Sequence, residues 1–511
     1  MCSSTLILIT TFTSVFVWYV YSCFKKRMKY WEDRGVFSVE ANFPFGNAKD
    51  LVFQKVSISD TVQKLYETMK LRSIPYGGYY FFTEPIFVPA DSKLIKRILI
   101  SDFEYFSDRS FHSHESDPLS IHLFALKGEP WKRLRNLLSP AFTPSKLKMM
   151  LPLMMESVNN FVDVVKQQIE TDETIDIFEI ASKLTTDITI STFFGLQPNT
   201  LKDDSKEFQE ISQKFFSESL RDAIVRTLSI INPEILTFFK IRSVHKSIAD
   251  FFIKMTKDII SYREDNNVVR QDLMHLLLQI RNNVIIDDNE IGFVRNSTVN
   301  EEKTLTIEEV AAQCFIFLLA GNESTTTLIS FCFYELGLNQ DFQERARKEV
   351  QAVFEESNGE ITLEGVQKLQ FMDKCLKEAL RKYPPAPVHL RECTKNYDVP
   401  NTQLTIEKGT RVFISVAGIH HDSDNYKDPD VFDPERFSSN TKPCVWTPFG
   451  DGPRACIAPQ IASLMVKLAV SLFLLNFKFT VSPKTGSTVI FKKTTFVLRP
   501  KDGIWLSIKK I

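Results

Sequence analysis

The stretch WTPFGDGPRACIAPQIASLMVKLAVSLF, residues 446 to 473, places one cysteine between a glycine-rich turn and a long apolar run. Two glycines and Pro453 are typical of a turn, and the residues after Pro459 are typical of a helix. Cys456 therefore lies at the expected start of this helix, two residues after Arg454. A single cysteine at this position either has a chemical role, such as binding a metal, or is an ordinary buried side chain of the core.

The use of cysteine and histidine narrows the choice. The eight cysteines are spread through 511 residues without a C-x-x-C pair, and the eight histidines lack an H-E-x-x-H arrangement. This usage is not typical of a disulfide framework or a zinc site, and it favours a reducing compartment. If Cys456 binds a metal, it is the sole protein ligand, and a prosthetic group supplies the others. The alternative is a small buried hydrophobic side chain, as most free cysteines are.

Charge and length say less about function. The 62 basic residues are balanced by 63 acidic ones, so no overall field attracts nucleic acid. The chain is longer than a usual single core, but it shows no Gly/Ser-rich or Pro-rich linker and no internal repeat. We therefore expect one large, mainly α domain with small β-sheets. The 43 phenylalanines fit either a hydrophobic ligand cavity or a large core.

The first 24 residues carry no charged side chain. As a helix, Leu6 to Phe24 would span about 28 Å, close to the thickness of a bilayer core. A basic run follows at residues 25–29, which by the positive-inside rule places the rest of the chain in the cytosol. We expect a transmembrane anchor at residues 1–24, a basic stop-transfer and hinge segment at 25–50, and the main domain at 51–511.

Strand signals occur at residues 77–90 and 487–511, where β-branched and aromatic runs broken by Gly and Pro favour hairpins. Helical periodicity dominates the middle of the chain. Thr306 and Glu309 have the spacing of a capping box, and the pattern continues to about Gly337, roughly 48 Å. This helix is apolar nearly all round, so we expect it to be buried.

Inside this helix lies AGNESTTT, residues 320 to 327. Glu323, Ser324 and Thr325 are costly in a buried helix unless they are hydrogen bonded or wet. Ala320 and Gly321 reduce side-chain bulk on the same turn, so a flat ligand could lie against the backbone. The alternative is a kinked helix whose hydroxyls bond back to carbonyls one turn earlier.

Three further stretches bear on the fold. EALR places Glu378 and Arg381 one turn apart, FDPERF offers Arg436, and WKRLR places Trp131 and Arg135 on one face. Together with FGDGPRACIA, in this order, they resemble the cytochrome P450 family of haem-thiolate monooxygenases from about residue 36 to the end. In finer detail the sequence is most similar to the insect microsomal enzymes of the detoxification branch. The stretches that carry this similarity are FPFGN, LKGEPWKRLRNLLSPAF, RECTKNYDVP and HHDSDNYKDPDVFDPERF. The resemblance implies the cytochrome P450 fold, with a helical haem-binding domain and a long central helix across the haem.

The resemblance assigns roles to individual residues. Cys456 would be the proximal thiolate ligand of the iron of haem b, and Glu378, Arg381 and Arg436 would form a buried structural cluster. The positions that match the haem-binding signature or the contacts to the haem propionates are Phe449, Gly452, Arg454, Trp131, Arg135 and Arg391. The positions that match the oxygen-activating turn are Ala320, Gly321, Glu323 and Ser324, with Thr325 as the neighbouring alcohol.

A lone thiol needs help to stay ionised, and the sequence offers three sources. These are the iron itself, backbone N–H groups of the turn shaped by Gly452, and the positive end of the helix that begins near Ala458, with Pro459 in its first turn. Phe449 can cover the sulfur. The chain departs from the family at Ala458, where glycine is usual, at Ser324, where threonine is usual, and at Asn322, where an apolar or aromatic residue is common.

The implied reaction inserts one oxygen atom of O2 into a hydrophobic small molecule, either a xenobiotic or an endogenous lipophilic compound. No G-x-G-x-x-G follows a strand here, so the sequence shows no nicotinamide site of its own. The resemblance implies that electrons from NADPH come through the flavins of NADPH-cytochrome P450 reductase, with cytochrome b5 as a further partner. An acidic partner could dock on a basic set at residues Lys132, Arg133, Lys146 and Lys148, or these could form an ordinary solvated face.

The anchor and the resemblance together predict a protein of the endoplasmic reticulum membrane with a cytosolic catalytic domain. Two apolar segments, residues 120–126 and 229–240, are candidates to line the substrate site, and the second is also a candidate for a shallow membrane contact. Two other functions remain open at this point: a haem-thiolate isomerase or dehydratase, which needs neither O2 nor reductase, and a non-enzymatic haem sensor or sequestering protein.

Overall fold

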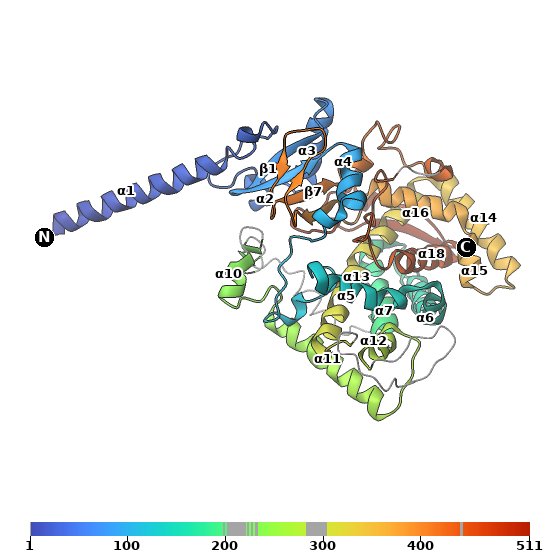
Figure 1. The fold of residues 1–511 in the computed structure, drawn as a ribbon. Coiled ribbons are helices and arrows are strands. Elements are labelled where there is room, and N and C mark those ends of the chain that lie inside the picture. The colour runs from blue at the N-terminus through green and yellow to red at the C-terminus, as the bar shows by residue number, and fades with distance from the viewer. Residues whose placement is uncertain are drawn as a thin grey trace.

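The computed structural model describes residues 2–197, 200–201, 221, 224–225, 228–229, 233–282, 304–439 and 443–511. Helices make up most of the body, and small sheets lie at two of its edges (Figure 1). The helices are α1 (Cys2–Arg27), α2 (Lys49–Val52), α3 (Ile58–Leu71), α4 (Ser92–Lys96), α5 (Gly128–Leu138), α6 (Pro144–Gln168), α7 (Ile177–Phe194), α10 (Pro233–Phe238), α11 (Lys246–Asp265), α12 (Leu273–Arg281), α13 (Ile307–Leu338), α14 (Gln340–Glu356), α15 (Leu363–Lys368), α16 (Gln370–Lys382), α17 (Val416–His420) and α18 (Pro459–Asn476).

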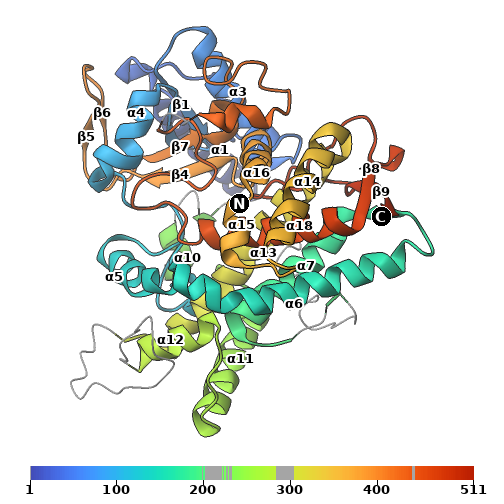
Figure 2. The ribbon, with the colours of Figure 1, turned by 90° about the vertical axis from the view of Figure 1, so that its right-hand side faces the viewer.

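The long helix α13 runs through the middle of the body, with α7 and α18 beside it (Figure 2). Its start is the predicted capping box: Thr306 accepts a hydrogen bond from the Glu309 N–H, and the Glu309 carboxylate accepts one from the Thr306 N–H. The predicted end near Gly337 is also confirmed. Because the helix is apolar on most sides, it can be buried against several neighbours at once.

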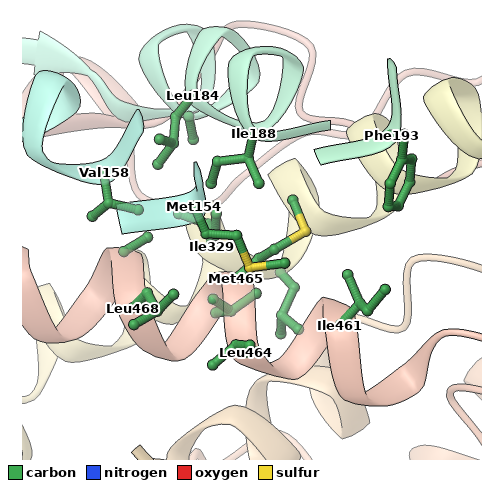
Figure 3. Close-up of a cluster of buried hydrophobic side chains, with 14 of the residues drawn as sticks. Met154, Val158, Leu184, Ile188, Phe193, Ile329, Ile461, Leu464, Met465 and Leu468 are labelled. Carbon is green, nitrogen blue, oxygen red and sulfur yellow. The ribbon is translucent and has the colours of Figure 1, made fainter. Parts of the chain in front are cut away.

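Four helices share one core. Side chains from α6, α7, α13 and α18 converge in Figure 3, where Met154, Leu184, Ile329 and Met465 lie close together. All four are buried. This packing fixes α18 against α13, and therefore fixes where the chain before α18, including Cys456, meets the central helix.

The strands form small sheets around this helical core. In the first sheet, the order β1-β2-β7-β4 joins the antiparallel hairpin predicted at residues 77–90 to two later strands. The strands are β1 (Tyr76–Phe81), β2 (Glu84–Pro89), β3 (Thr174–Asp176), β4 (Val388–Glu392), β5 (Tyr397–Asp398), β6 (Thr405–Ile406), β7 (Arg411–Ser415), β8 (Phe477–Val481) and β9 (Trp505–Lys510).

The C-terminal segment differs from the prediction of hairpins within residues 487–511. Its strand β9 pairs antiparallel with β8, which directly follows α18, and with β3 on its other side. Within the segment itself there is one isolated bridge, between Phe491 and Pro500. The β-branched and aromatic run located the strand, but the partner of a strand is set by packing elsewhere in the chain.

The N-terminal helix α1 projects from the body (Figure 1). Among the described residues, three helices are long and apolar enough to cross a membrane, and two of these, α13 and α18, are mostly buried inside the protein. The first is almost entirely exposed, with side chains such as Phe12 and Trp18 facing outward. After it, Trp31 is buried beneath Gly78 of β1, which ties the segment that follows α1 to the first sheet.

Candidate functional site

The loop before α18 holds Cys456 by its own backbone. The Cys456 N–H donates to the carbonyl of Phe449 at 2.8 Å, which closes the loop. Gly452 has a φ of +72°, and a Cβ there would lie 1.9 Å from the carbonyl oxygen of Leu99. Only glycine fits both the left-handed conformation and this close approach. The helix begins at Pro459, as predicted, and the Ala458 N–H points to the Cys456 sulfur at 3.4 Å.

Cys456 lies deep in the protein, yet its side chain keeps accessible surface. Burial raises the pKa of the thiol, while the Ala458 N–H and the guanidinium groups of Arg135 and Arg109 lower it. The other cysteines of the body, Cys314, Cys332, Cys375, Cys393 and Cys444, are all buried. Among the described residues after α1, Cys456 is thus the one cysteine with room beside its sulfur and cations nearby, which is the environment of a metal-binding thiolate.

Four arginines gather around this loop. Arg135 from α5 donates to the carbonyl of Ala455 at 3.1 Å, and Arg109 donates to the carbonyl of Arg454 at 2.8 Å. Arg454 donates to the carbonyls of Ser107 and Leu126, and its guanidinium lies 3.9 Å from the centre of the Trp131 ring. Trp131 therefore supports Arg454 by stacking.

The four arginines carry more positive charge than nearby carboxylates of the described residues neutralise. Among the described residues, the ion pair of Arg454 with Asp108, at 3.7 Å, is the only one formed by these four arginines. Burial lowers the pKa of Arg454 to about 9 and that of Arg391 to about 10. Burial, together with repulsion from Arg391 and Arg454, lowers the pKa of Arg109 well below its usual range.

These features fit a haem. Arg391 is buried, and its Nε is a buried donor without a hydrogen-bond partner among the described residues. Planar guanidinium groups suit carboxylates, and two propionates would offset the repulsion within the cluster. The thiol supplies a soft ligand for iron. Cys456, Arg109, Arg135, Arg391 and Arg454 are therefore the residues that could hold the cofactor.

The middle of α13 has accessible surface although its flanking turns are buried. Ala320 is exposed and Ser324, one turn later, is partly exposed, whereas Thr325 is only 2% exposed. Residues four apart share a helix face, so Ala320 and Ser324 border the same space. The Ser324 hydroxyl donates to the carbonyl of Ala320 at 2.6 Å, as the back-bonding alternative predicted. The back-bonding alternative is therefore confirmed for Ser324, and its role towards a ligand stays a prediction.

The neighbouring acid has a different environment. Glu323 is buried, and its carboxylate forms an ion pair with Arg499 at 3.4 Å. Burial raises the pKa of Glu323, while Arg499 and Lys492 lower it. Glu323 thus lies next to Ser324 in the chain, paired with a cation of the C-terminal segment.

Asn322, an unusual residue in this turn, also has polar partners. Its side-chain amide donates to the hydroxyl of Thr186 on α7, and its carbonyl oxygen accepts a hydrogen bond from Thr326 at 3.4 Å. Thr326 in turn shares a 2.7 Å hydrogen bond with Thr185. Polar side chains therefore join α13 to α7 at this position, where the family commonly has an apolar or aromatic residue.

The predicted ionic cluster forms behind the loop. Glu378 and Arg381 of α16 are fully buried and form an ion pair of 2.7 Å, and Arg436 approaches Glu378 at 3.2 Å. Arg381 also donates to the carbonyl of His420 at 2.9 Å. The cluster thus connects α16 to the segment that leads to the cysteine loop.

The basic docking set needs a correction. Lys146 is 4% exposed, because α6 turns it towards the interior, so the prediction that it faces a partner is wrong. Arg133 is held by Glu309 at 2.8 Å and joins α5 to the start of α13. Lys132 and Lys148 are exposed, and each pairs with a glutamate of this chain. The sequence showed the charges but not which way each side chain turns.

The two segments that were candidates to line the substrate site have different environments. In residues 120–126, Leu123 is tied to the central helix, since its N–H donates to Gln313 at 2.9 Å. In residues 229–240, of which 230–232 lie outside the described residues, Phe238 and Phe239 are 81% and 65% exposed. These two phenylalanines therefore belong to the surface and do not line the interior.

Arg109 was missed in the sequence. It lies in an irregular stretch after α4, where no periodicity or fixed spacing marks it. Its neighbours Arg454 and Arg391 are far away in the chain, so only the fold brings the three cations together. The one available signal was an arginine within an aromatic run, YFSDRSF, and the side chain indeed stacks on an aromatic ring, that of Phe124 at 4.1 Å.

Comparisons with known proteins agree with this site. The family model of cytochrome P450 matches residues 45–507. "Probable cytochrome P450 6a14" of Drosophila melanogaster is 33% identical, covering 96% of this chain and 97% of its own length. "Cytochrome P450 6k1" of Blattella germanica is 34% identical, covering all of this chain and 97% of its own length. The chain therefore belongs to the cytochrome P450 family and is a haem-thiolate monooxygenase, which acts on small molecules with O2 and redox partners.

Proposed function

We propose that this chain is a membrane-bound monooxygenase that inserts one oxygen atom of O2 into hydrophobic xenobiotics or endogenous lipophilic compounds. Its cofactor is haem b, with the Cys456 thiolate as the iron ligand. Electrons come from NADPH through the flavins of NADPH-cytochrome P450 reductase, with cytochrome b5 as a second donor. The observation that carries the proposal is the accessible Cys456 thiol beside four arginines, of which Arg391 and Arg454 are buried, with Asp108 as their one carboxylate partner among the described residues.

One group of residues would hold the haem, and a second group would deliver protons. Arg109, Arg135, Arg391 and Arg454 would hold the propionates, and Trp131 stacks on Arg454. Phe449 anchors the loop through its carbonyl, and its ring would cover the sulfur. When bound, the haem supplies the iron centre at which O2 is reduced and the substrate is oxidised.

On the other side of the site, Ala320 leaves room next to the helix and Ser324 orients a water molecule that carries protons inward. Glu323 relays those protons from outside the pocket. Thr325 is the alternative alcohol for this role, and its burial argues for Ser324.

The test of this proposal is turnover of the full-length protein with reductase, NADPH and a panel of lipophilic substrates. Product should form only when reductase, NADPH and O2 are all present. Turnover without O2 or NADPH would instead indicate an isomerase or dehydratase. Failure to consume NADPH above the reductase background with any substrate would favour a haem sensor or sequestering protein.

Ser324 gives a sharper prediction. Ser324→Ala removes the hydroxyl, so we expect product per NADPH to fall by about 100-fold, the low end of the range for a positioned proton-transfer group. The lost electrons should appear as hydrogen peroxide. Ser324→Thr keeps the hydroxyl and restricts its χ1, so peroxide should fall or stay unchanged.

Thr325→Ala is the matched control for this measurement of peroxide and product against NADPH oxidation. It should behave like the parent, because Thr325 is turned into the core. If Thr325→Ala is uncoupled and Ser324→Ala is not, the role belongs to Thr325.

The proposed location is the endoplasmic reticulum membrane. Residues 1–24 form the anchor, residues 25–50 the basic stop-transfer and hinge segment, and residues 51–511 the cytosolic catalytic domain. The support is the exposed apolar helix α1, with Lys25, Lys26 and Arg27 in its last turn. In Figure 1, α10 lies on the same side of the body as α1, which allows a second, shallow contact with the bilayer.

Deleting residues 1–24 should leave part of the protein on membranes. The exposed Phe238 and Phe239 can insert at the interface, so we expect the truncated protein to cosediment partly with lipid vesicles. Adding Phe238→Asp and Phe239→Asp should release it. Val431→Asp, at another exposed apolar position, is the control and should change nothing. A truncated protein that is fully soluble at low detergent would contradict the second contact.

A further inference from the structure

The segment that leads to Cys456 has one residue whose backbone is held on both sides. From Cys444 to Cys456 the chain forms turns and bends without a regular helix or strand. Buried backbone groups in such a segment need partners from elsewhere. At Thr447 the N–H donates to His420 Nε2 at 3.0 Å, and the carbonyl oxygen lies 2.7 Å from His389 Nε2 and also accepts from the Gly450 N–H at 3.0 Å.

The partners fix the tautomer of each ring. Because His420 Nε2 accepts from the Thr447 N–H, it carries no proton, and His420 Nδ1 donates to the carbonyl of Arg381 at 3.1 Å. His389 has the opposite arrangement, since a carbonyl can only accept, so Nε2 carries the proton. The contacts to Thr447 are therefore made by neutral imidazole rings. Burial lowers the pKa of both rings, which favours this neutral form.

The two rings belong to elements that are bonded to other parts of the fold. His389 lies on β4, within its pairing with β7, and His420 ends α17. Arg381 donates to the carbonyl of His420 and accepts from its ring, so His420 is bound to the ionic cluster of α16 at two points. The position of Thr447 is therefore set by a sheet on one side and by the buried ion pair on the other.

We propose that His389 and His420 are positioning residues that clamp the peptide groups of Thr447 and so hold the loop that presents Cys456. This inference rests on the proposed role of Cys456 as the iron ligand. The loop needs such a clamp because Gly450 and Gly452, both with positive φ, leave the backbone between Thr447 and Cys456 easy to deform. The His389 ring also borders Gly450, since a Cβ there would lie 3.8 Å from His389 Cε1.

The test compares two substitutions of His389 in the full-length, haem-loaded protein. His389→Gln places an amide N–H where Nε2 was and should keep the hydrogen bond to Thr447. His389→Asn places its amide at the position of Nδ1 and should lose that bond. The measured quantity is the rate at which the ferrous carbonyl complex changes, on mild heating, from the red-shifted Soret band of thiolate ligation to the band without it.

We expect His389→Asn to convert about tenfold faster than the parent, the upper end of the effect of losing one hydrogen bond, since the Gly450 N–H still donates to the Thr447 carbonyl. His389→Gln should convert at close to the parent rate. His421→Asn is the matched control, because His421 is the chain neighbour of His420 but bonds to the carbonyl of Ala417 at 2.9 Å and not to the loop. It should behave like the parent.

Equal rates for His389→Gln and His389→Asn would overturn the clamp while leaving the proposed function intact. The same conclusion would follow if His421→Asn converted as fast as His389→Asn, since the effect would then be general destabilisation. A parent protein that lacks the thiolate band would overturn the proposed function instead.

Discussion

Replacing Cys456 with alanine should abolish the red-shifted Soret band that thiolate ligation gives to the ferrous carbonyl complex. The reason is that this cysteine combines an accessible side chain, a backbone N–H at 3.4 Å from its sulfur and nearby guanidinium groups. Every other described cysteine after α1 is buried. The measurement is the difference spectrum between the reduced protein with and without carbon monoxide, normalised to haem content.

Cys444→Ala is the control for this experiment. Cys444 lies in the same segment but is buried, and the carboxylate of Asp451 raises the pKa of its thiol in the same direction as burial does. The variant should keep the band. If the Cys456→Ala protein retained the band, another residue would ligate the iron, and the roles given to the loop would be wrong.

Glu378→Ala should be the most destabilising substitution outside the cofactor site. Glu378 accepts hydrogen bonds from Arg381 at 2.7 and 2.9 Å, from the Asp433 N–H at 2.9 Å and from Arg436 at 3.2 Å. Removing it leaves the fully buried Arg381 charge without its partner. We expect the free energy of unfolding to fall by about 3–5 kcal/mol.

The matched control lies on the same helix. Lys377 pairs with Asp373 at 2.8 Å, but both side chains are substantially exposed. Lys377→Ala should therefore cost less than about 1 kcal/mol. Denaturant unfolding of the haem-loaded protein, followed by circular dichroism, measures both. A Glu378→Ala protein as stable as the Lys377→Ala protein would show that the ionic cluster does not hold the core together.

The sequence predicted the features that depend on local order. The capping box at Thr306, the hairpin at residues 77–90 and the start of the last helix at Pro459 each rest on residues a few positions apart. Their partners are close in the chain, so spacing alone determines them. The Glu378–Arg381 pair belongs to the same class, because both residues lie on one turn of α16.

What the sequence could not predict depends on distant parts of the chain. Arg109 joins the arginine cluster only because the loop after α4 folds onto the segment before α18. Lys146 has the same charge as Lys148 two residues later, but helix α6 turns one inward and the other outward. The contact of His389 with Thr447 spans 58 positions. Such contacts are set by the packing of whole elements, which no short motif encodes.

The most direct test of the account is the iron coordination shell of the haem-loaded, full-length protein, measured by X-ray absorption at the iron edge. We predict one sulfur scatterer beside the four porphyrin nitrogens in the parent protein, and the loss of that sulfur in Cys456→Ala. A shell of nitrogen and oxygen alone in the parent, or a sulfur that persists in Cys456→Ala, would contradict the assignment of Cys456 as the proximal ligand.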